Sequence, residues 1–198
     1  MKIGGKSLAS LHQLSELYDP SSNRQWDWQD ILQKINTILQ SYPNEKEAIQ
    51  ELHTLTAYLQ NLPISSSNYG LIHYDFQLDN LFYEEKYRSF HVIDFDDAVY
   101  SWYAHDIVTA LDDFLDDATH VDHLPVKFFL QGYRSIRSLS DEDIKSFPYF
   151  QRFMKLYQFS KLLWTLEGSD IVDAPQWLDD LKLKLIRARD RLRHSFCK

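Results

Sequence analysis

The chain has 198 residues, of which 44% are hydrophobic and 15% are aromatic, and its formal net charge is −8. This composition excludes a disordered chain, and the length allows one domain with a substantial core. The negative charge argues against non-specific binding to nucleic acid, and no apolar run approaches the roughly 18 residues of a membrane helix.

The cysteine content bears on the cellular compartment. Cys197 lies next to the C-terminus and has no second cysteine with which to form an internal disulfide. The sequence also shows no apparent signal peptide. Both features are typical of proteins from a reducing compartment, so we expect a cytoplasmic protein.

The first part of the chain carries three amphipathic patterns. Apolar residues recur at spacings of three and four over residues 8–18, 31–39 and 48–59. This spacing predicts three helices that each bury one face in a shared core. The patterns stop at "DPSSN", at Pro43 and at Pro63, which are expected helix breakers.

From Gly70 the apolar runs become short. "LIHYD", "NLFYE" and "FHVIDF" are rich in aromatic and β-branched residues, and the polar stretch "EKYRS" separates the last two. Such runs predict strands, so we expect a small β-hairpin over roughly residues 81–95. The polar loop 75–80 would lead into this hairpin.

Helical spacing returns after the hairpin, over residues 107–115 and 126–136. Ser140 followed by Asp143 predicts a capping box, and Pro175 stands where the last helix would begin. The fold class predicted is therefore mainly α with a small β-hairpin. We expect a single domain made of a helical part (1–69), a loop and hairpin (70–96) and a second helical part (97–198).

A polar cluster lies at the hairpin. Asp75 and Asn80 precede its first strand, and Asp94 follows its second strand. A hairpin would return Asn80 and Asp94 to the same end, where an amide oxygen and a carboxylate are hard ligands that suit Mg²⁺. Asp75 could accept a proton from an attacking hydroxyl, so the pattern indicates phosphoryl transfer.

Four segments carry a resemblance to a known family: "GKSLASLHQLS", "LIHYDFQLDNLF", "VIDFDDA" and "YSWYAHDIVTAL". Together they resemble the aminoglycoside phosphotransferase and choline kinase branch of the protein-kinase-like phosphotransferases. The resemblance implies that Asp75 is the catalytic base and that Asn80 and Asp94 bind Mg²⁺. It also implies that His73 and Asp106 hold the catalytic loop in shape.

The resemblance further implies O-phosphorylation of a small alcohol, such as an aminoglycoside, by ATP or GTP with Mg²⁺. Asp96 would support the site, either as a further metal ligand or through hydrogen bonds within its turn. Two positions depart from the family pattern, because Tyr74 replaces the usual glycine and Gln77 replaces a frequent histidine. Tyr74 adds bulk beside Asp75 and could change substrate access, so the identity of the substrate stays open.

The segment before the loop is expected to be helical, whereas such kinases carry an N-terminal β-lobe with a nucleotide-binding lysine. No G-x-G-x-x-G motif occurs, and "GGKS" (4–7) matches only the end of a Walker A loop. We therefore expect the C-terminal lobe alone, weakly active or inactive by itself. An exposed apolar face would then be covered by a missing N-lobe or by a homodimer partner.

Acidic and aromatic residues suggest where a cationic substrate would bind. Asp112, Asp113 and Asp116 lie in "LDDFLDDATHVD" (111–122), which the spacing predicts to be one helix. In the resembled family, acidic helices of this lobe receive ammonium groups, and Trp102 could add an aromatic wall. A solvated helix face and simple core packing remain the alternatives for these residues.

Two other function classes stay open. His73, His105 and Asp106, with a later acid such as Asp170, resemble the H…HD…D series of metal-dependent phosphohydrolases. That interpretation leaves Asp75, Asn80 and Asp94 unexplained. The other alternative is a pseudokinase-like lobe that binds a ligand or partner without transferring phosphate.

Overall fold

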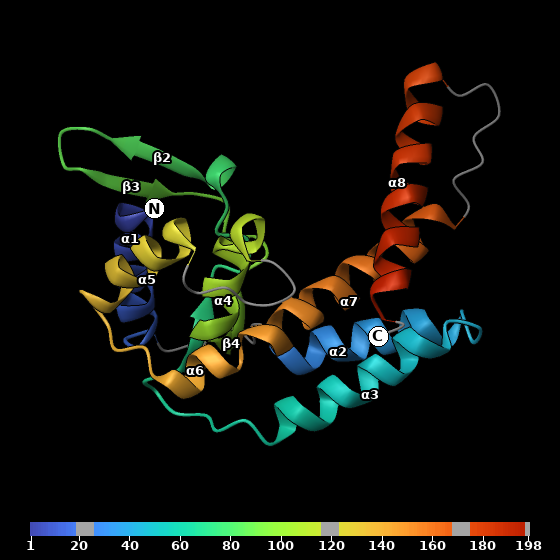
Figure 1. The fold of residues 1–198 in the computed structure, drawn as a ribbon, viewed down its shortest axis with the longest axis horizontal. Helices are drawn as coiled ribbons and strands as arrows, with labels where there is room; N and C mark the ends of the chain where they lie inside the picture. The colour runs from blue at the N-terminus through green and yellow to red at the C-terminus, as the bar shows by residue number, and fades with distance from the viewer. Residues whose placement is uncertain (19–25, 116–122, 168–174, 197–198) are drawn as a thin grey trace. The chain divides into compact units, whose positions relative to one another are not determined.

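A computed structural model describes residues 1–18, 26–115, 123–167 and 175–196 (Figure 1). The chain forms two compact units, and each is built from two separate stretches of sequence. Unit 1 comprises Met1–Trp28 and Pro63–Gln151, and unit 2 comprises Gln29–Leu62 and Arg152–Lys198. The polar cluster identified in the sequence lies in unit 1.

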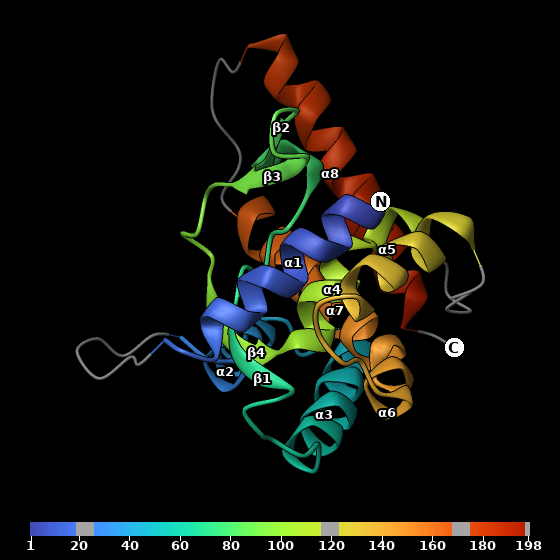
Figure 2. The same ribbon diagram turned by 90° about the vertical axis from the view of Figure 1, so that its left-hand side faces the viewer.

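The helices of unit 1 are α1 (Lys2–Ser15), α4 (Tyr103–Ala110), α5 (Leu124–Arg134), α6 (Asp141–Lys145) and the first turn of α7 (Phe147–Leu166). α1 and α5 lie side by side in both Figure 1 and Figure 2. Gly5 and Gly132 allow this approach, because a Cβ at either residue would lie 2.0 Å from a carbonyl oxygen of the other helix. The glycines of "GGKS" therefore belong to a helix and do not form a phosphate loop.

Two small antiparallel sheets complete unit 1. β2 (Leu81–Glu84) and β3 (Ser89–Val92) form a hairpin, as the sequence predicts. β1 (Tyr69–Ile72) pairs with β4 (Val99–Trp102), with Ile72 opposite Val99. This second sheet is not among the sequence predictions. It brings the two ends of the 73–98 segment together, because β1 enters that segment and β4 leaves it.

Residues 111–115, the described part of the segment expected to form one helix over 111–122, are not α-helical. α4 ends at Ala110, and Asp112 and Asp113 lie in a short 3₁₀ helix, η2 (Asp112–Phe114). Carboxylates are unfavourable at the C-terminal end of an α-helix, where the helix dipole is negative. Asp116 lies outside the described residues.

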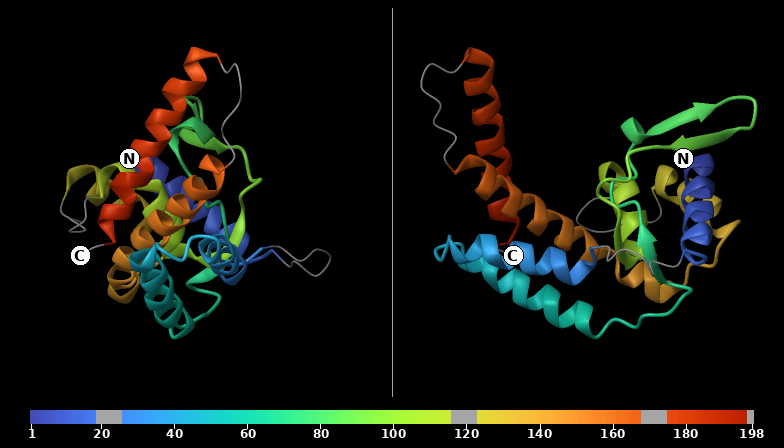
Figure 3. Two further views of the ribbon diagram at one scale, coloured as in Figure 1. Left: turned by 90° about the vertical axis from the view of Figure 1, so that its right-hand side faces the viewer. Right: turned by 180° about the vertical axis from the view of Figure 1, so that it is seen from behind.

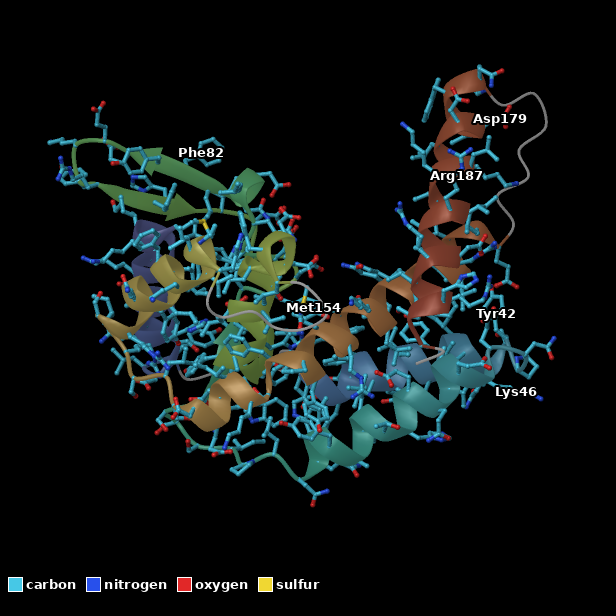
Figure 4. All side chains as sticks on the ribbon, in the orientation of Figure 1. Tyr42, Lys46, Phe82, Met154, Asp179 and Arg187 are labelled. Carbon is cyan, nitrogen blue, oxygen red and sulfur yellow. The ribbon has the colours of Figure 1, made fainter. Side chains whose placement is uncertain are left out.

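Unit 2 contains most of α2 (Trp28–Gln40), α3 (Lys46–Gln60), the rest of α7, and α8 (Gln176–Ser195), all shown in Figure 3. α2 and α3 form the walls of an open groove of about 480 Å³. Tyr42, labelled in Figure 4, ties the end of α2 to α7 through a 2.8 Å hydrogen bond to Glu167. The three amphipathic patterns before residue 60 thus correspond to α1, α2 and α3.

The predicted fold class is confirmed, since the described part of the chain is mainly helical with small β-elements. Within these residues, no helix combines the length and apolar character that crossing a membrane requires.

Candidate active site

Asp75 and Asn80 are joined directly. The Asn80 side-chain nitrogen donates to the Asp75 carboxylate and to the Asp75 backbone carbonyl, each at 2.9 Å. A 3₁₀ turn, η1 (Leu78–Asn80), brings Asn80 back toward Asp75. Because both partners are acceptors, the amide nitrogen must face them, and the amide oxygen of Asn80 points elsewhere.

Asp94 is positioned by the end of the hairpin. The Ile93 backbone N–H donates to the Asn80 carbonyl at 3.1 Å, which extends the ladder beyond β2 and β3 by one bond. The His73 ring bonds the Ile93 carbonyl at 2.9 Å. Asp94 therefore follows a residue whose polar backbone groups are both held, and its own φ is 62°.

His73 is a structural histidine in this arrangement. Its ring is fully buried, with Nε2 donating to the Ile93 carbonyl and Nδ1 accepting the Asp75 N–H at 3.3 Å. Both ring nitrogens are used within the loop, so the ring ties the start of the loop to the residue before Asp94.

Asp106 holds the backbone at the start of the loop. Its Oδ2 accepts the His73 N–H at 2.9 Å, and its Oδ1 accepts the Tyr74 N–H at 2.8 Å. Burial by itself would raise the pKa of this carboxyl, but hydrogen bonds from His12 and from the two amides outweigh burial and lower that pKa. Asp106 is thus a charged carboxylate in the interior.

Sequence reasoning missed His12 and Tyr133. His12 Nε2 lies 3.0 Å from Asp106 Oδ2, and His12 Nδ1 lies 2.8 Å from the Tyr133 hydroxyl. One signal was available, because His12 follows Leu8 by four residues and so falls on the apolar stripe of α1. A polar residue on a buried helix face needs a hydrogen-bond partner, but the helical spacing does not identify that partner.

Tyr74 adopts a backbone conformation that suits the glycine expected there. Its φ is 68°, in the left-handed region that side chains with a Cβ disfavour. The Tyr74 ring contacts the buried His105 edge-on, with centroids 5.0 Å apart. The side chain added at this position is therefore accommodated against α4.

The predicted substrate residues fall in two places. Asp112 and Asp113 line a cavity of about 290 Å³ together with Asp79 and Gln77 of the loop. Trp102 lies in the core instead, 2% exposed, and its indole N–H donates to the Pro63 carbonyl at 2.9 Å. The buried Trp102 ring therefore cannot contact a bound ligand.

Asp96 is exposed in the turn after Asp94, which a 3.0 Å backbone bond from Ala98 to Phe95 closes. The nearby apolar side chains of Phe82, Ile93 and Phe95 are also exposed. Figure 4 shows Phe82 on the side of the hairpin away from α1.

The phosphohydrolase alternative finds no support in the described residues. They contain no group of three or more histidine, cysteine, aspartate or glutamate side chains placed to hold a metal ion. His105 stacks on Phe150 and bonds Ser101, while Asp106 is taken up by His12 and the loop amides. Asp170 lies outside the described residues.

This chain is mainly helical, and its polar loop and hairpin lie between two paired strands. That fold is the one of the helical C-terminal lobe of a protein-kinase-like phosphotransferase. The chain belongs to the phosphotransferase enzyme family (APH), which residues 5–139 match. The resemblance stated from the sequence is thereby confirmed.

Individual proteins show the same relationship. The chain is 28% identical over 172 residues to an amicoumacin kinase of Bacillus subtilis (strain 168), covering 80% of this chain and 49% of that protein. A solved amicoumacin kinase in complex with AMP-PNP, Ca²⁺ and Ami matches 98% of this chain and 58% of its own, with a TM-score of 0.75 and 24% identity.

A microcompartment-associated aminopropanol kinase matches 99% of this chain and 61% of its own, with a TM-score of 0.59 and 24% identity. Both structural likenesses concern the fold. The chain spans about half the length of the curated relative and less than two thirds of these solved structures.

Proposed function

We propose that the site catalyses transfer of the γ-phosphoryl group of ATP or GTP to a hydroxyl group of a small cationic alcohol. The observation that carries the proposal is the direct bond between Asn80 and the Asp75 carboxylate. It joins a candidate base to a candidate metal ligand. Family membership supports the reaction class, as do relatives named amicoumacin kinase and aminopropanol kinase.

Asp75 is the proposed catalytic base. Its carboxylate accepts the proton of the acceptor hydroxyl as the hydroxyl oxygen attacks the γ-phosphorus, and the Asn80 amide keeps that carboxylate oriented. General-base assistance of this kind contributes about 10²- to 10⁴-fold. The remaining rate enhancement comes from positioning and charge neutralisation.

Asn80 and Asp94 are the proposed ligands of Mg²⁺. The Asn80 side-chain nitrogen bonds Asp75, which leaves the amide oxygen to bind a metal ion, and Asp94 supplies a carboxylate. These oxygen ligands suit a hard cation that also keeps water and phosphate ligands. When bound, the ion would neutralise charge on the phosphate oxygens. Asp96 is the candidate for a further ligand or for a hydrogen bond within the turn.

The acceptor subsite is proposed in the cavity beside the loop. Asp79, Asp112 and Asp113 give it negative charge, and apolar residues such as Phe76 and Phe114 line the rest. An ammonium group would be attracted to these carboxylates, while the apolar lining would contact a carbon skeleton. The volume of about 290 Å³ suits an amino alcohol of few atoms better than an aminoglycoside.

Phosphoryl transfer is tested by incubating the chain with Mg²⁺, ATP or GTP, and a panel of amino alcohols, with the phosphorylated product followed by ³¹P NMR. We expect Asp75→Asn to abolish product formation. Asp141→Asn is the matched control, because Asp141 is a 93% exposed aspartate on α6. Turnover that survives Asp75→Asn would overturn the assignment of the base.

Metal binding is measured separately with Mn²⁺ as the probe, through water-proton relaxation. Asp94→Asn should weaken Mn²⁺ binding, whereas Asp141→Asn should leave it unchanged. Binding of a ligand or partner without turnover would support the non-catalytic alternative. Absent turnover together with absent nucleotide binding is instead the result expected of a C-terminal lobe that lacks its nucleotide-binding lobe.

The exposed apolar residues near the site motivate a proposal about partners. Phe82, Ile93 and Phe95 are between 44% and 58% exposed. We propose that an additional lobe or a second copy of the chain covers them, since exposed apolar surface of this kind marks interaction sites. Light scattering tests the second copy: a dimer that Phe82→Ser dissociates supports it, and a monomer at all concentrations refutes it.

A further inference from the structure

A continuous row of hydrogen bonds leads from α5 to the backbone of the catalytic loop. The Tyr133 hydroxyl lies 2.8 Å from His12 Nδ1, and His12 Nε2 lies 3.0 Å from Asp106 Oδ2. Asp106 in turn accepts the N–H groups of His73 and Tyr74. All the side chains that form this row are buried, and all belong to unit 1.

The donor and acceptor roles along this row are determined by the chemistry of the partners. The Asp106 carboxylate can only accept, so His12 Nε2 carries the proton. Burial lowers the pKa of His12, although the bond to Asp106 acts in the opposite direction, so the ring is neutral. Nδ1 is then an acceptor and the Tyr133 hydroxyl donates to it.

The orientation of the His12 ring is also held by stacking. Its ring lies on Tyr103 with centroids 4.3 Å apart and an interplanar angle of 25°. Arg137 covers the Tyr103 ring at 4.5 Å and pairs with Glu16 at 2.7 Å. His12 is therefore constrained by two hydrogen bonds and by an aromatic face.

Asp106 Oδ2 is the atom through which His12 reaches the loop. The same oxygen accepts both the His12 N–H and the His73 backbone N–H. Loss of the histidine donor would leave that oxygen less constrained, and the His73 N–H that is bonded to it would be less constrained as well. The His73 ring accepts the Asp75 N–H, and the Asp75 carboxylate accepts the Asn80 amide.

We propose that His12 is a positioning residue that acts through Asp106 on the loop that carries Asp75 and Asn80. The proposal rests on the proposed function only in naming Asp75 as the base. The opposing possibility is a role in stability alone, in which His12 supports the core of unit 1 and the loop keeps its geometry without it.

The test compares His12→Phe with His12→Gln by NMR on the full chain. Phenylalanine keeps the stack on Tyr103 and loses both hydrogen bonds, whereas the glutamine amide nitrogen can replace Nε2 as donor. The reporters are the backbone amides of His73 and Tyr74 and the side-chain amide of Asn80. Val108, buried in α4, reports opening of the whole unit.

We expect His12→Phe to accelerate exchange of the His73 and Tyr74 amides about tenfold or more relative to the Val108 amide. The Asn80 side-chain resonances should shift, and His12→Gln should reverse both effects. Equal acceleration at all three backbone amides, or unchanged Asn80 resonances, would show a role in stability alone and overturn the proposal.

Tyr133→Phe gives a second, milder variant in case His12→Phe does not fold. It removes only the hydroxyl that donates to His12 Nδ1, so smaller changes in the same direction are expected. A folded Tyr133→Phe protein with an unchanged loop would contradict the proposal. None of these measurements needs a nucleotide or an acceptor, so a failed phosphoryl-transfer assay is a separate result.

Discussion

Two adjacent glycines of α1 are predicted to respond oppositely to the same substitution. A Cβ at Gly5 would lie 2.0 Å from the Phe129 carbonyl oxygen and 2.9 Å from the Tyr133 nitrogen, both backbone atoms of α5. A Cβ at Gly4 would lie 3.5 Å from the nearest atom of the Phe129 ring, an ordinary contact. Only Gly5→Ala therefore requires the two helices to move apart.

The magnitudes follow from these distances. Replacing glycine by alanine inside a helix stabilises it by about 1 kcal/mol, and this gain applies to both positions. The contact at Gly5 is roughly 1.4 Å shorter than the 3.4 Å at which ordinary contacts begin. Overpacking of this kind costs about 1–3 kcal/mol or more, and here the obstructing atoms are backbone. We expect Gly5→Ala to lower the free energy of unfolding by about 2 kcal/mol and Gly4→Ala to raise it by up to about 1 kcal/mol.

Urea unfolding of the two variants measures this difference, with tryptophan fluorescence as the signal. Trp28 and Trp102 are buried in unit 1 and report its unfolding. Effects of the same sign and size in the two variants, or a stabilised Gly5→Ala protein, would refute the close approach of α1 and α5.

Three further predictions concern Asp106, His105 and Tyr74. Asp106→Asn should lower the free energy of unfolding at pH 7 by about 3 kcal/mol, because an amide cannot replace a carboxylate that accepts three hydrogen bonds. Urea unfolding measures this change. Burial lowers the pKa of His105 from 6.5 to about 3, so the unfolded chain binds a proton that the folded chain does not. As the pH falls from 6.5 toward 3, this group should therefore lower the free energy of unfolding by about 1.4 kcal/mol per pH unit. A His105→Gln variant whose free energy of unfolding depends on pH between 7 and 5 as steeply as that of the unchanged protein would contradict the lowered pKa of His105. Tyr74→Gly should be about 1 kcal/mol more stable than Tyr74→Ala, because both lose the ring but only glycine relieves the strain at φ 68°; equal thermal melting temperatures would argue against that strain.

Local patterns were sufficient for much of the fold. The apolar spacing over residues 8–18, 31–39 and 48–59 predicts α1, α2 and α3, and the run of short apolar segments predicts the β2–β3 hairpin. Ser140 forms the expected capping box with Asp143. These features depend on residues close in the sequence, where backbone geometry alone determines which side chains meet.

The same patterns failed where a distant partner or the environment of a helix end decided the outcome. β4 was not expected, because Val99–Trp102 becomes a strand by pairing with β1, about thirty residues earlier. The run 111–122 has helical spacing, yet α4 ends at Ala110, before two carboxylates that the helix dipole disfavours. Trp102 offered an aromatic wall in the sequence but fills the core in the structure.

For this protein, the sequence by itself determined α1, α2 and α3, the hairpin, and the order of Asp75, Asn80 and Asp94 around it. Only the tertiary structure brought His12 to Asp106, 94 residues away, and to Tyr133, 121 residues away. Such pairs depend on which faces of α1, α4 and α5 meet, and helical periodicity indicates that a face is buried without indicating against what. The close contacts of Gly5 and Gly132 bring α1 and α5 together, and with them the buried residues behind the loop that carries Asp75 and Asn80.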